Sequence, residues 1–303
     1  MNVRTGWRIV GFWVLSLLVG TAHAADSLYA FGPDGDGVGR VFTQVVPSAP
    51  GVALGDGSVA FNGGLTYLAS DQRFYAIQND AYGNSALTSF TAAAPSALST
   101  PLALGTGFYG GLAADSGSST LYAVASDSFG ASTLYRIDTS SGAVALTALG
   151  LGFYGGLVFD SADGDLYAVG ADDFGVQRRV SRIDLGAAGG PAVSTLFDLG
   201  DGSLGFQGGL AFDALAQRFV VIGNDAFAQS ALYAFTTLGA ASLVDLATPV
   251  GVGFVNVGLA FAPAVAAVPE PASIVLLAGA MPLLLLFSRR ARAGRVEPSR
   301  QPS

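Results

Sequence analysis

The segment that decides the fold runs from Phe153 to Asp184 and reads FYGGLVFDSADGDLYAVGADDFGVQRRVSRID. Its pattern occurs three more times, beginning at Phe61, Phe108 and Phe206. The leucines directly after the four Gly-Gly pairs are Leu65, Leu112, Leu157 and Leu210, which are spaced by 47, 45 and 53 residues. A fifth leucine, Leu259, follows 49 residues later within VGLAFAP. A period near 48 residues is typical of the four-stranded blades of a β-propeller.

Each unit is expected to supply four antiparallel strands, named a to d from the centre outward. Gly-Gly-Leu opens strand a, where small residues let five backbones converge. The run Leu-Tyr-Ala-Val is strand b, and its consecutive apolar residues predict burial on both faces. Segments such as 134–137 form strand c, and the more variable stretch 142–149 forms strand d on the outside. Residues 25–268 contain twenty Asp and no Glu, which favours strands and turns over helices.

The fifth unit is divided between the two ends of the chain. Only one strand's length follows Leu259 before the Ala-Pro hinge at 262–268. The missing strands are supplied by LYAFGPDGDGVGRVFTQV from Leu28, which aligns with LYAVASDSFGASTLYRID from Leu121. The sequence therefore predicts an all-β, five-bladed propeller, whose last blade joins one carboxy-terminal strand to three amino-terminal strands. Such closure removes exposed sheet edges.

One rim of this propeller collects the candidate ligand residues. Because antiparallel strands alternate in direction, the loop entering strand a and the loop leaving strand b share a rim. An aspartate stands six residues after the Leu or Phe that begins the apolar run of each strand b: Asp34, Asp80, Asp127, Asp172 and Asp225. Two places after the aspartate, four units carry an aromatic residue: Tyr82, Phe129, Phe174 and Phe227. The composite unit carries Asp36 there instead.

Carboxylates beside aromatics can coordinate a cation or hold a sugar. The stronger interpretation of the rim is architectural. An aspartate at a strand end accepts hydrogen bonds from turn amides, and the aromatic after it is expected to fill the gap between blades. A residue that recurs in every blade is explained more simply by the blade than by a site needed once.

Composition excludes much of enzyme chemistry. The chain has no Cys and no Lys, and its only His and its two Trp lie in the first 24 residues. A chain that loses those residues has no thiol nucleophile, no Schiff-base lysine and no Ser-His-Asp triad. Residues 25–268 carry seven Arg against twenty Asp, a net charge of −13, which disfavours nucleic acid as a partner. We therefore predict no catalytic residues and no metal site.

Three weaker patterns remain. Asp34-Gly35-Asp36-Gly37 and Asp163-Gly164-Asp165 are similar to calcium loops but lack the closing Glu, so calcium is a low-ranked alternative to having no cofactor. Turn chemistry accounts for the aspartates three places after the strand-a leucine: Asp115, Asp160 and Asp213. A cluster of arginines in the third unit is expected to be a local basic, solvated face: Arg178, Arg179 and Arg182.

The first 24 residues have the layout of a secretory signal peptide. Arg4 and Arg8 precede an apolar run at 9–19, and Ala22-His23-Ala24 follows it. Cleavage is expected after Ala24, which leaves a head at 25–263. Export makes the absence of Cys informative, because the compartment would permit disulfides and the protein does not use them.

The carboxy terminus has three parts in a fixed order. A hinge at 264–273 carries Pro269-Glu270-Pro271, an apolar helix is expected at 274–288, and a basic tail occupies 289–303. The helix is short for a permanent span, and the arginines after it are expected on the cytoplasmic side. This arrangement resembles the PEP-CTERM sorting signal of exported Gram-negative bacterial proteins. The resemblance implies an exosortase-type membrane protease as partner, at least transient anchoring in the inner membrane, and delivery to the cell surface or extracellular matrix.

These patterns predict an exported, surface-directed, non-catalytic structural or interaction protein that associates with exopolysaccharide or biofilm matrix. A first alternative is a lectin-like propeller that binds glycans through the aromatic rim. A second alternative is an Asp-dependent glycoside hydrolase, which needs a pair of carboxylates at the reacting bond.

Overall fold

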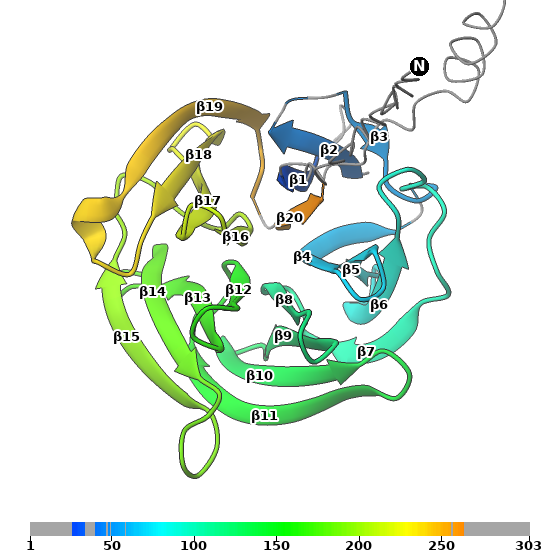
Figure 1. Ribbon diagram of the computed structural model, residues 1–303, viewed down its shortest axis with the longest axis horizontal. Coiled ribbons are helices and arrows are strands. Elements are labelled where there is room, and N and C mark those ends of the chain that lie inside the picture. Colours follow the sequence, from blue (N-terminus) through cyan, green and yellow to red (C-terminus); the bar gives the residue numbers. More distant parts are fainter. Residues whose placement is uncertain are drawn as a thin grey trace, which may run out of the picture.

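The computed structural model describes residues 26–33, 40–46, 48, 50–57, 59–255 and 257–263. These residues form five four-stranded antiparallel sheets arranged around a central axis (Figure 1). The predicted five-bladed β-propeller is thereby confirmed. In the four blades that are continuous in sequence, the chain runs from the strand at the centre to the strand at the periphery.

Four blades are continuous in sequence. Blade 1 consists of β4 (Ala60–Leu68), β5 (Arg73–Asn79), β6 (Asn84–Phe90) and β7 (Leu102–Thr106). Blade 2 consists of β8 (Leu112–Asp115), β9 (Thr120–Ser126), β10 (Ala131–Asp138) and β11 (Gly142–Leu151). Blade 3 consists of β12 (Leu157–Asp160), β13 (Asp165–Ala171), β14 (Gln177–Asp184) and β15 (Ala192–Asp198). Blade 4 consists of β16 (Leu210–Asp213), β17 (Arg218–Asn224), β18 (Gln229–Phe235), the short 3-10 helix η1 (Ala240–Ser242) and β19 (Val244–Val252).

The fifth blade is the predicted composite. Its strand order is β20 (Leu259–Pro263), β1 (Asp26–Pro33), β2 (Arg40–Val46) and β3 (Val52–Ala53). Leu28 of β1 lies opposite Phe261 of β20 in an antiparallel register. The two ends of the described chain therefore share one sheet, and Figure 1 shows this sheet between blades 4 and 1.

The inner strands meet at the glycine directly before the strand-a leucine of each repeat. A Cβ on Gly156 would lie 2.2 Å from the amide nitrogen of Leu210 in the next blade. The corresponding distances at the other four seams are 2.0–2.3 Å: Gly64 to Leu112, Gly111 to Leu157, Gly209 to Leu259 and Gly258 to Leu65. No side chain fits there, so glycine is needed for the blades to converge. The last pair closes the ring between the composite blade and blade 1.

The core lies between neighbouring blades. The second strand of a blade is buried on both faces, as its apolar run predicts, whereas outer strands such as β15 are largely exposed. The seam beside the composite blade is rich in aromatic rings. Phe42 stacks on Tyr29 with ring centroids 5.3 Å apart and meets Phe74 and Phe90 edge-on at 5.0 Å each. Closure of the ring is therefore a large apolar interface.

Several sequence predictions lie outside the described residues. These are the signal peptide with Ala22 and Ala24, the sorting motif Pro269-Glu270-Pro271, the apolar helix at 274–288 and the basic tail at 289–303. Asp34 and Asp36 of the composite blade also lie outside them. Within the described part of the chain, no helix has the length and apolar character needed to cross a membrane.

Candidate functional site

The hairpins that join the second and third strands of blades 1 to 4 share one turn geometry. In blade 2 the Gly130 amide donates to the Asp127 carbonyl at 3.1 Å, and the Asp127 amide donates to the Ala131 carbonyl at 3.0 Å. Gly130 has φ +83°, so the loop is a type I turn followed by one left-handed residue. Oδ1 of Asp127 accepts the amides of Phe129 and Ala131, both at 2.9 Å.

The same side-chain contacts recur in the other three hairpins. Asp80, Asp172 and Asp225 each accept the amides two and four residues further along the chain, at 2.8–2.9 Å. In each case the carboxylate ties the loop to both of its strands. Four of the five recurring aspartates are thus accounted for as turn-forming residues.

The aromatic residues of these turns contradict the expectation that they fill the gaps between blades. They are 82–89% exposed: Tyr82, Phe129, Phe174 and Phe227. The physical reason is that a central residue of a tight turn lies beyond the ends of both strands and has no neighbouring strand to pack on. The gaps are filled instead by the buried phenylalanines that open the repeat: Phe61, Phe108, Phe153 and Phe206. We call the four exposed aromatics the aromatic rim.

A polar cavity opens on the axis within the aromatic rim. Its volume is about 660 Å³, and it is lined by Asn62, Tyr109, Tyr154, Ala171, Gly175, Gln177 and Gln207. Four of these residues occupy the variable place between the Phe and the Gly-Gly of the repeat: Asn62, Tyr109, Tyr154 and Gln207. Sequence reasoning missed this cavity. The available signal was a residue that changes among the four plain repeats while the Phe before it and the Gly-Gly after it stay the same.

The cavity does not continue freely through the molecule. At the glycine and leucine ring the space shrinks to about 10 Å³, roughly the room for a single water. A second cavity of about 380 Å³ opens on the opposite face, where aromatic side chains such as Tyr67 and Phe212 line it together with polar ones such as Asp115. The two mouths therefore differ in their lining residues, and the one lined by phenol and amide side chains lies inside the aromatic rim.

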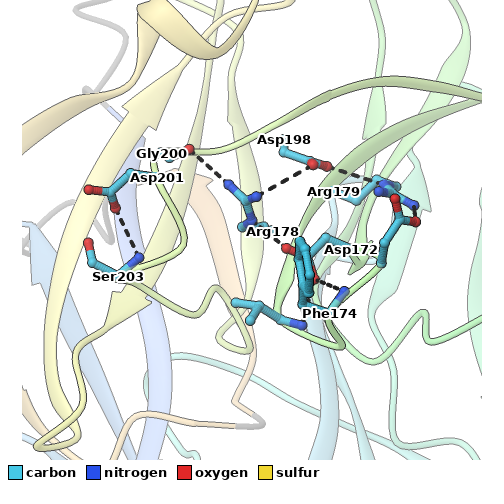
Figure 2. A network of polar contacts seen from close by, with 10 residues as sticks. Asp172, Phe174, Arg178, Arg179, Asp198, Gly200, Asp201 and Ser203 are labelled. Atoms are coloured by element: carbon cyan, nitrogen blue, oxygen red, sulfur yellow. Dashed lines mark hydrogen bonds and ion pairs between the residues drawn. The ribbon is translucent and has the colours of Figure 1, made fainter.

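The three arginines of blade 3 do not form the solvated basic face expected from the sequence. Figure 2 shows Arg178 between Asp172, Asp198 and the carbonyl of Gly200. Nε of Arg178 lies 2.6 Å from Asp172 Oδ2, and its Nη1 lies 2.9 Å from the Gly200 oxygen. The reason is that β15 and the loop after it bring Asp198 and Gly200 beside the start of β14.

The other two arginines are paired as well. Arg179 contacts Asp173 at 3.0 Å and Asp198 at 3.2 Å, and Arg182 is ion-paired with Asp165. The acidic loop around Asp163 is likewise built into the blade, because Asp163 accepts the Asp165 amide at 3.0 Å and the Tyr167 hydroxyl at 2.6 Å. No group of three or more His, Cys, Asp or Glu that could hold a metal ion occurs among the described residues.

Two aspartates of the rim turns have shifted pKa values. The hydrogen bond from Arg178 holds the pKa of the Asp172 carboxyl below its ordinary value, and the Asn84 side chain lowers the pKa of Asp80. Both shifts favour the charged form. At the opposite rim, turn amides bind the aspartates that the sequence assigned to turns: Asp115, Asp160 and Asp213.

Fold and site together define a five-bladed β-propeller with an aromatic rim around a polar axial cavity. No protein-family model and no curated protein matches the sequence. Among solved structures, TolB from Acinetobacter baumannii aligns with TM-score 0.46 and 10% identity over 79% of this chain and 67% of its own. The SapL1 lectin in complex with alpha methyl fucoside aligns with TM-score 0.48 and 10% identity over 75% of this chain and 80% of its own. A gluconolactonase from Xanthomonas campestris aligns with TM-score 0.47 and 13% identity over 76% of this chain and 78% of its own. Likeness at these identities concerns the fold alone.

Proposed function

We propose that the chain is an exported, non-catalytic binding protein of the cell surface or extracellular matrix. The order of its segments supports export and sorting: a signal peptide at 1–24, a propeller head, Pro269-Glu270-Pro271, an apolar helix and terminal arginines. In this proposal the tail is recognised by an exosortase-type protease after transient insertion in the inner membrane. The propeller head then remains outside the cell, where it binds the partner.

The observation that carries the binding role is the aromatic rim. Four large rings stand almost fully in solvent on one rim: Tyr82, Phe129, Phe174 and Phe227. Leaving such side chains exposed brings no stability to the fold, because apolar surface gains free energy only when it is buried. Each ring sits on a loop that an aspartate ties to both strands, so little conformational entropy is lost when a partner covers it.

The partner that fits this rim is a matrix polysaccharide. Aromatic rings contact the apolar faces of pyranose rings, while the amides and phenols of the cavity can hydrogen-bond sugar hydroxyls. Several separate rings around an axis suit a long chain that makes repeated weak contacts, since linked contacts strengthen one another. An anionic partner is less suitable, because residues 25–268 carry a net charge of −13.

A glycoside hydrolase is the weaker candidate. Such an enzyme needs two carboxyl groups free to act as acid and as base or nucleophile. On this rim Oδ1 of each described aspartate is occupied by turn amides, and Asp172 is also paired with Arg178. The carboxylates support the loops, and the rings on those loops face the solvent.

Retention on polysaccharide tests the proposal. The full-length protein is passed over immobilised dextran, mannan, cellulose and the producing cells' own exopolysaccharide, and a variant with serine at all four rim aromatics is compared. We expect the variant to bind the retaining polymer at least about tenfold more weakly, because several stacking contacts are lost together. Its melting temperature is expected to stay unchanged, since the rings are exposed.

The matched control removes similar apolar surface from loops outside the aromatic rim. Leu215 and Leu238 are each 91% exposed, so a Leu215→Ser and Leu238→Ser double variant should bind like the unmodified protein. Equal retention of the rim variant and the control, or no retention of the unmodified protein by any of the polymers, would overturn the proposed role.

A further inference from the structure

The axial cavity differs from the rest of the propeller in being asymmetric. Five residues after the turn aspartate, blades 1, 2 and 4 carry Ser85, Ser132 and Ser230. Blade 3 carries Gln177 at this place. All three serines are buried and accept the amide of a residue opening the next blade, at 3.1–3.2 Å. The serine at this place is therefore a joint between blades.

Gln177 does not use its side chain for that joint. The Phe206 amide donates to the backbone carbonyl of Gln177 at 2.7 Å, which leaves the amide side chain free of the structural task. Gln177 lines the axial cavity although it is only 3% exposed, and its Oε1 has no hydrogen-bond partner among the described residues. A buried oxygen without a partner is unfavourable, and in native proteins such groups are few and usually have a specific reason.

The surroundings hold Gln177 in place. Its neighbour Arg178 is fixed by Asp172 and by the Gly200 carbonyl, and Figure 2 shows that these contacts join the hairpin to the loop after β15. This loop belongs to the longest of the repeat intervals, the 53 residues between Leu157 and Leu210. Blade 3 thus carries a firmly supported polar group where the other blades carry a small structural hydroxyl.

The other walls of the cavity are also positioned. A Cβ on Gly83 would lie 3.0 Å from the Tyr109 hydroxyl, and a Cβ on Gly130 would lie 2.9 Å from the Tyr154 hydroxyl. Each tyrosine therefore lies across the seam against the turn of the preceding blade. The two phenols and the amide groups of Asn62, Gln177 and Gln207 surround one space.

We infer that this cavity, with Gln177 as its specific acceptor, binds one neutral sugar residue. Among the described residues no charged side chain lines it, so a neutral ligand suits this part of the wall better than an anion or a cation. Phenol and amide groups match a ring that has hydroxyls at its edge and C–H bonds on its faces. The volume of about 660 Å³ lies within the roughly 300–1,000 Å³ of small-molecule sites. The inference rests on the proposed function in one respect, since the residue is taken to be a unit of the polymer held by the aromatic rim.

The test uses simple sugars in place of the polymer. Binding of the methyl glycosides of glucose, mannose, galactose, fucose and N-acetylglucosamine to the full-length protein is measured by calorimetry and by saturation-transfer NMR. Gln177→Ser installs the residue of the other blades and should preserve the fold. We expect it to weaken the best glycoside by about tenfold with an unchanged melting temperature, because a sugar hydroxyl loses its buried acceptor.

Two controls make the result specific. Gln229→Ser removes an exposed glutamine from the same rim and should leave binding unchanged. Glucuronate should bind more weakly than methyl glucoside, because the described residues that line the cavity offer it no cation. Absence of binding by every glycoside into the millimolar range, or equal affinity of the Gln177→Ser protein, overturns the inference.

The two proposals fail in different ways. The variant with serine at the four rim aromatics should lose polymer retention but still bind the methyl glycoside, because it leaves the cavity unaltered. Polymer retention that depends on the rim, together with no glycoside binding, overturns the cavity inference alone. Glycoside binding that depends on Gln177, together with a rim variant that retains polymer, overturns the role of the aromatic rim alone.

Discussion

A Gly156→Ala protein is expected to be less stable than the unmodified protein by about 3 kcal/mol or more. The new methyl group would lie 2.2 Å from the amide nitrogen of Leu210, which is backbone held inside the next blade. Neither β12 nor β16 can move away to make room, because the inner strand of each blade makes the same close glycine-to-leucine contact with the next blade around the ring. A loss of this size is a large fraction of the roughly 5–15 kcal/mol that stabilises a typical domain.

Urea unfolding of the two proteins measures this difference directly. Gly205→Ala is the matched control, because a Cβ on Gly205 meets nothing within 4 Å and its φ is not positive. We expect the control to unfold within about 0.5 kcal/mol of the unmodified protein. Equal midpoints for Gly156→Ala and Gly205→Ala would mean that the inner strands do not converge as described.

Removal of residues 26–46 should prevent the head from folding as a soluble monomer. This deletion takes away β1 and β2, so β20 and β3 lose their partners and present open edges. It also removes Tyr29 and Phe42 from the aromatic seam that includes Phe74 and Phe90. Exposed edges and an uncovered apolar face both favour aggregation, which size-exclusion chromatography of the recovered protein will show.

A permuted protein separates loss of pairing from loss of the native chain order. Residues 26–57 are moved to follow Pro263 through a short Gly-Ser linker, which is feasible because Asp26 lies opposite Pro263 in the sheet. This protein should be soluble and melt near the unmodified temperature. A deletion variant as soluble and as heat-stable as the unmodified protein would contradict the shared blade.

The fold was predictable because the same sequence pattern marks the inner strands of each blade. The Gly-Gly-Leu segments could be placed at the axis from the sequence alone, since only small residues allow several backbones to meet. The composite blade followed from counting strands, as Leu28 aligns with Leu121 and only one strand follows Leu259. Closure needed no knowledge of side-chain packing.

The site was harder to predict, because its features depend on contacts between segments distant in sequence. The turn aspartates were assigned correctly from local chemistry, but Phe129 and its counterparts were expected to be buried and are exposed. Arg178 was expected to be solvated, but Asp172 of its own hairpin binds it, and Asp198 and the Gly200 carbonyl approach it from the end of the next strand and the loop after it. Gln177 was overlooked, although comparison with Ser132 would have marked it as the exception among repeats.

One engineered cross-link tests the closed ring most directly. The chain has no cysteine, so a Ser27→Cys and Ala262→Cys protein carries only two thiols, at positions that lie opposite each other on β1 and β20. Neighbouring antiparallel strands bring such residues within the reach of a disulfide. After export and mild oxidation, mass spectrometry of the unreduced protein should find the two peptides joined within one chain, while a Ser27→Cys and Ala131→Cys protein stays reduced. Two free thiols in the first protein, or equal cross-linking of both, would contradict a propeller closed by its two ends.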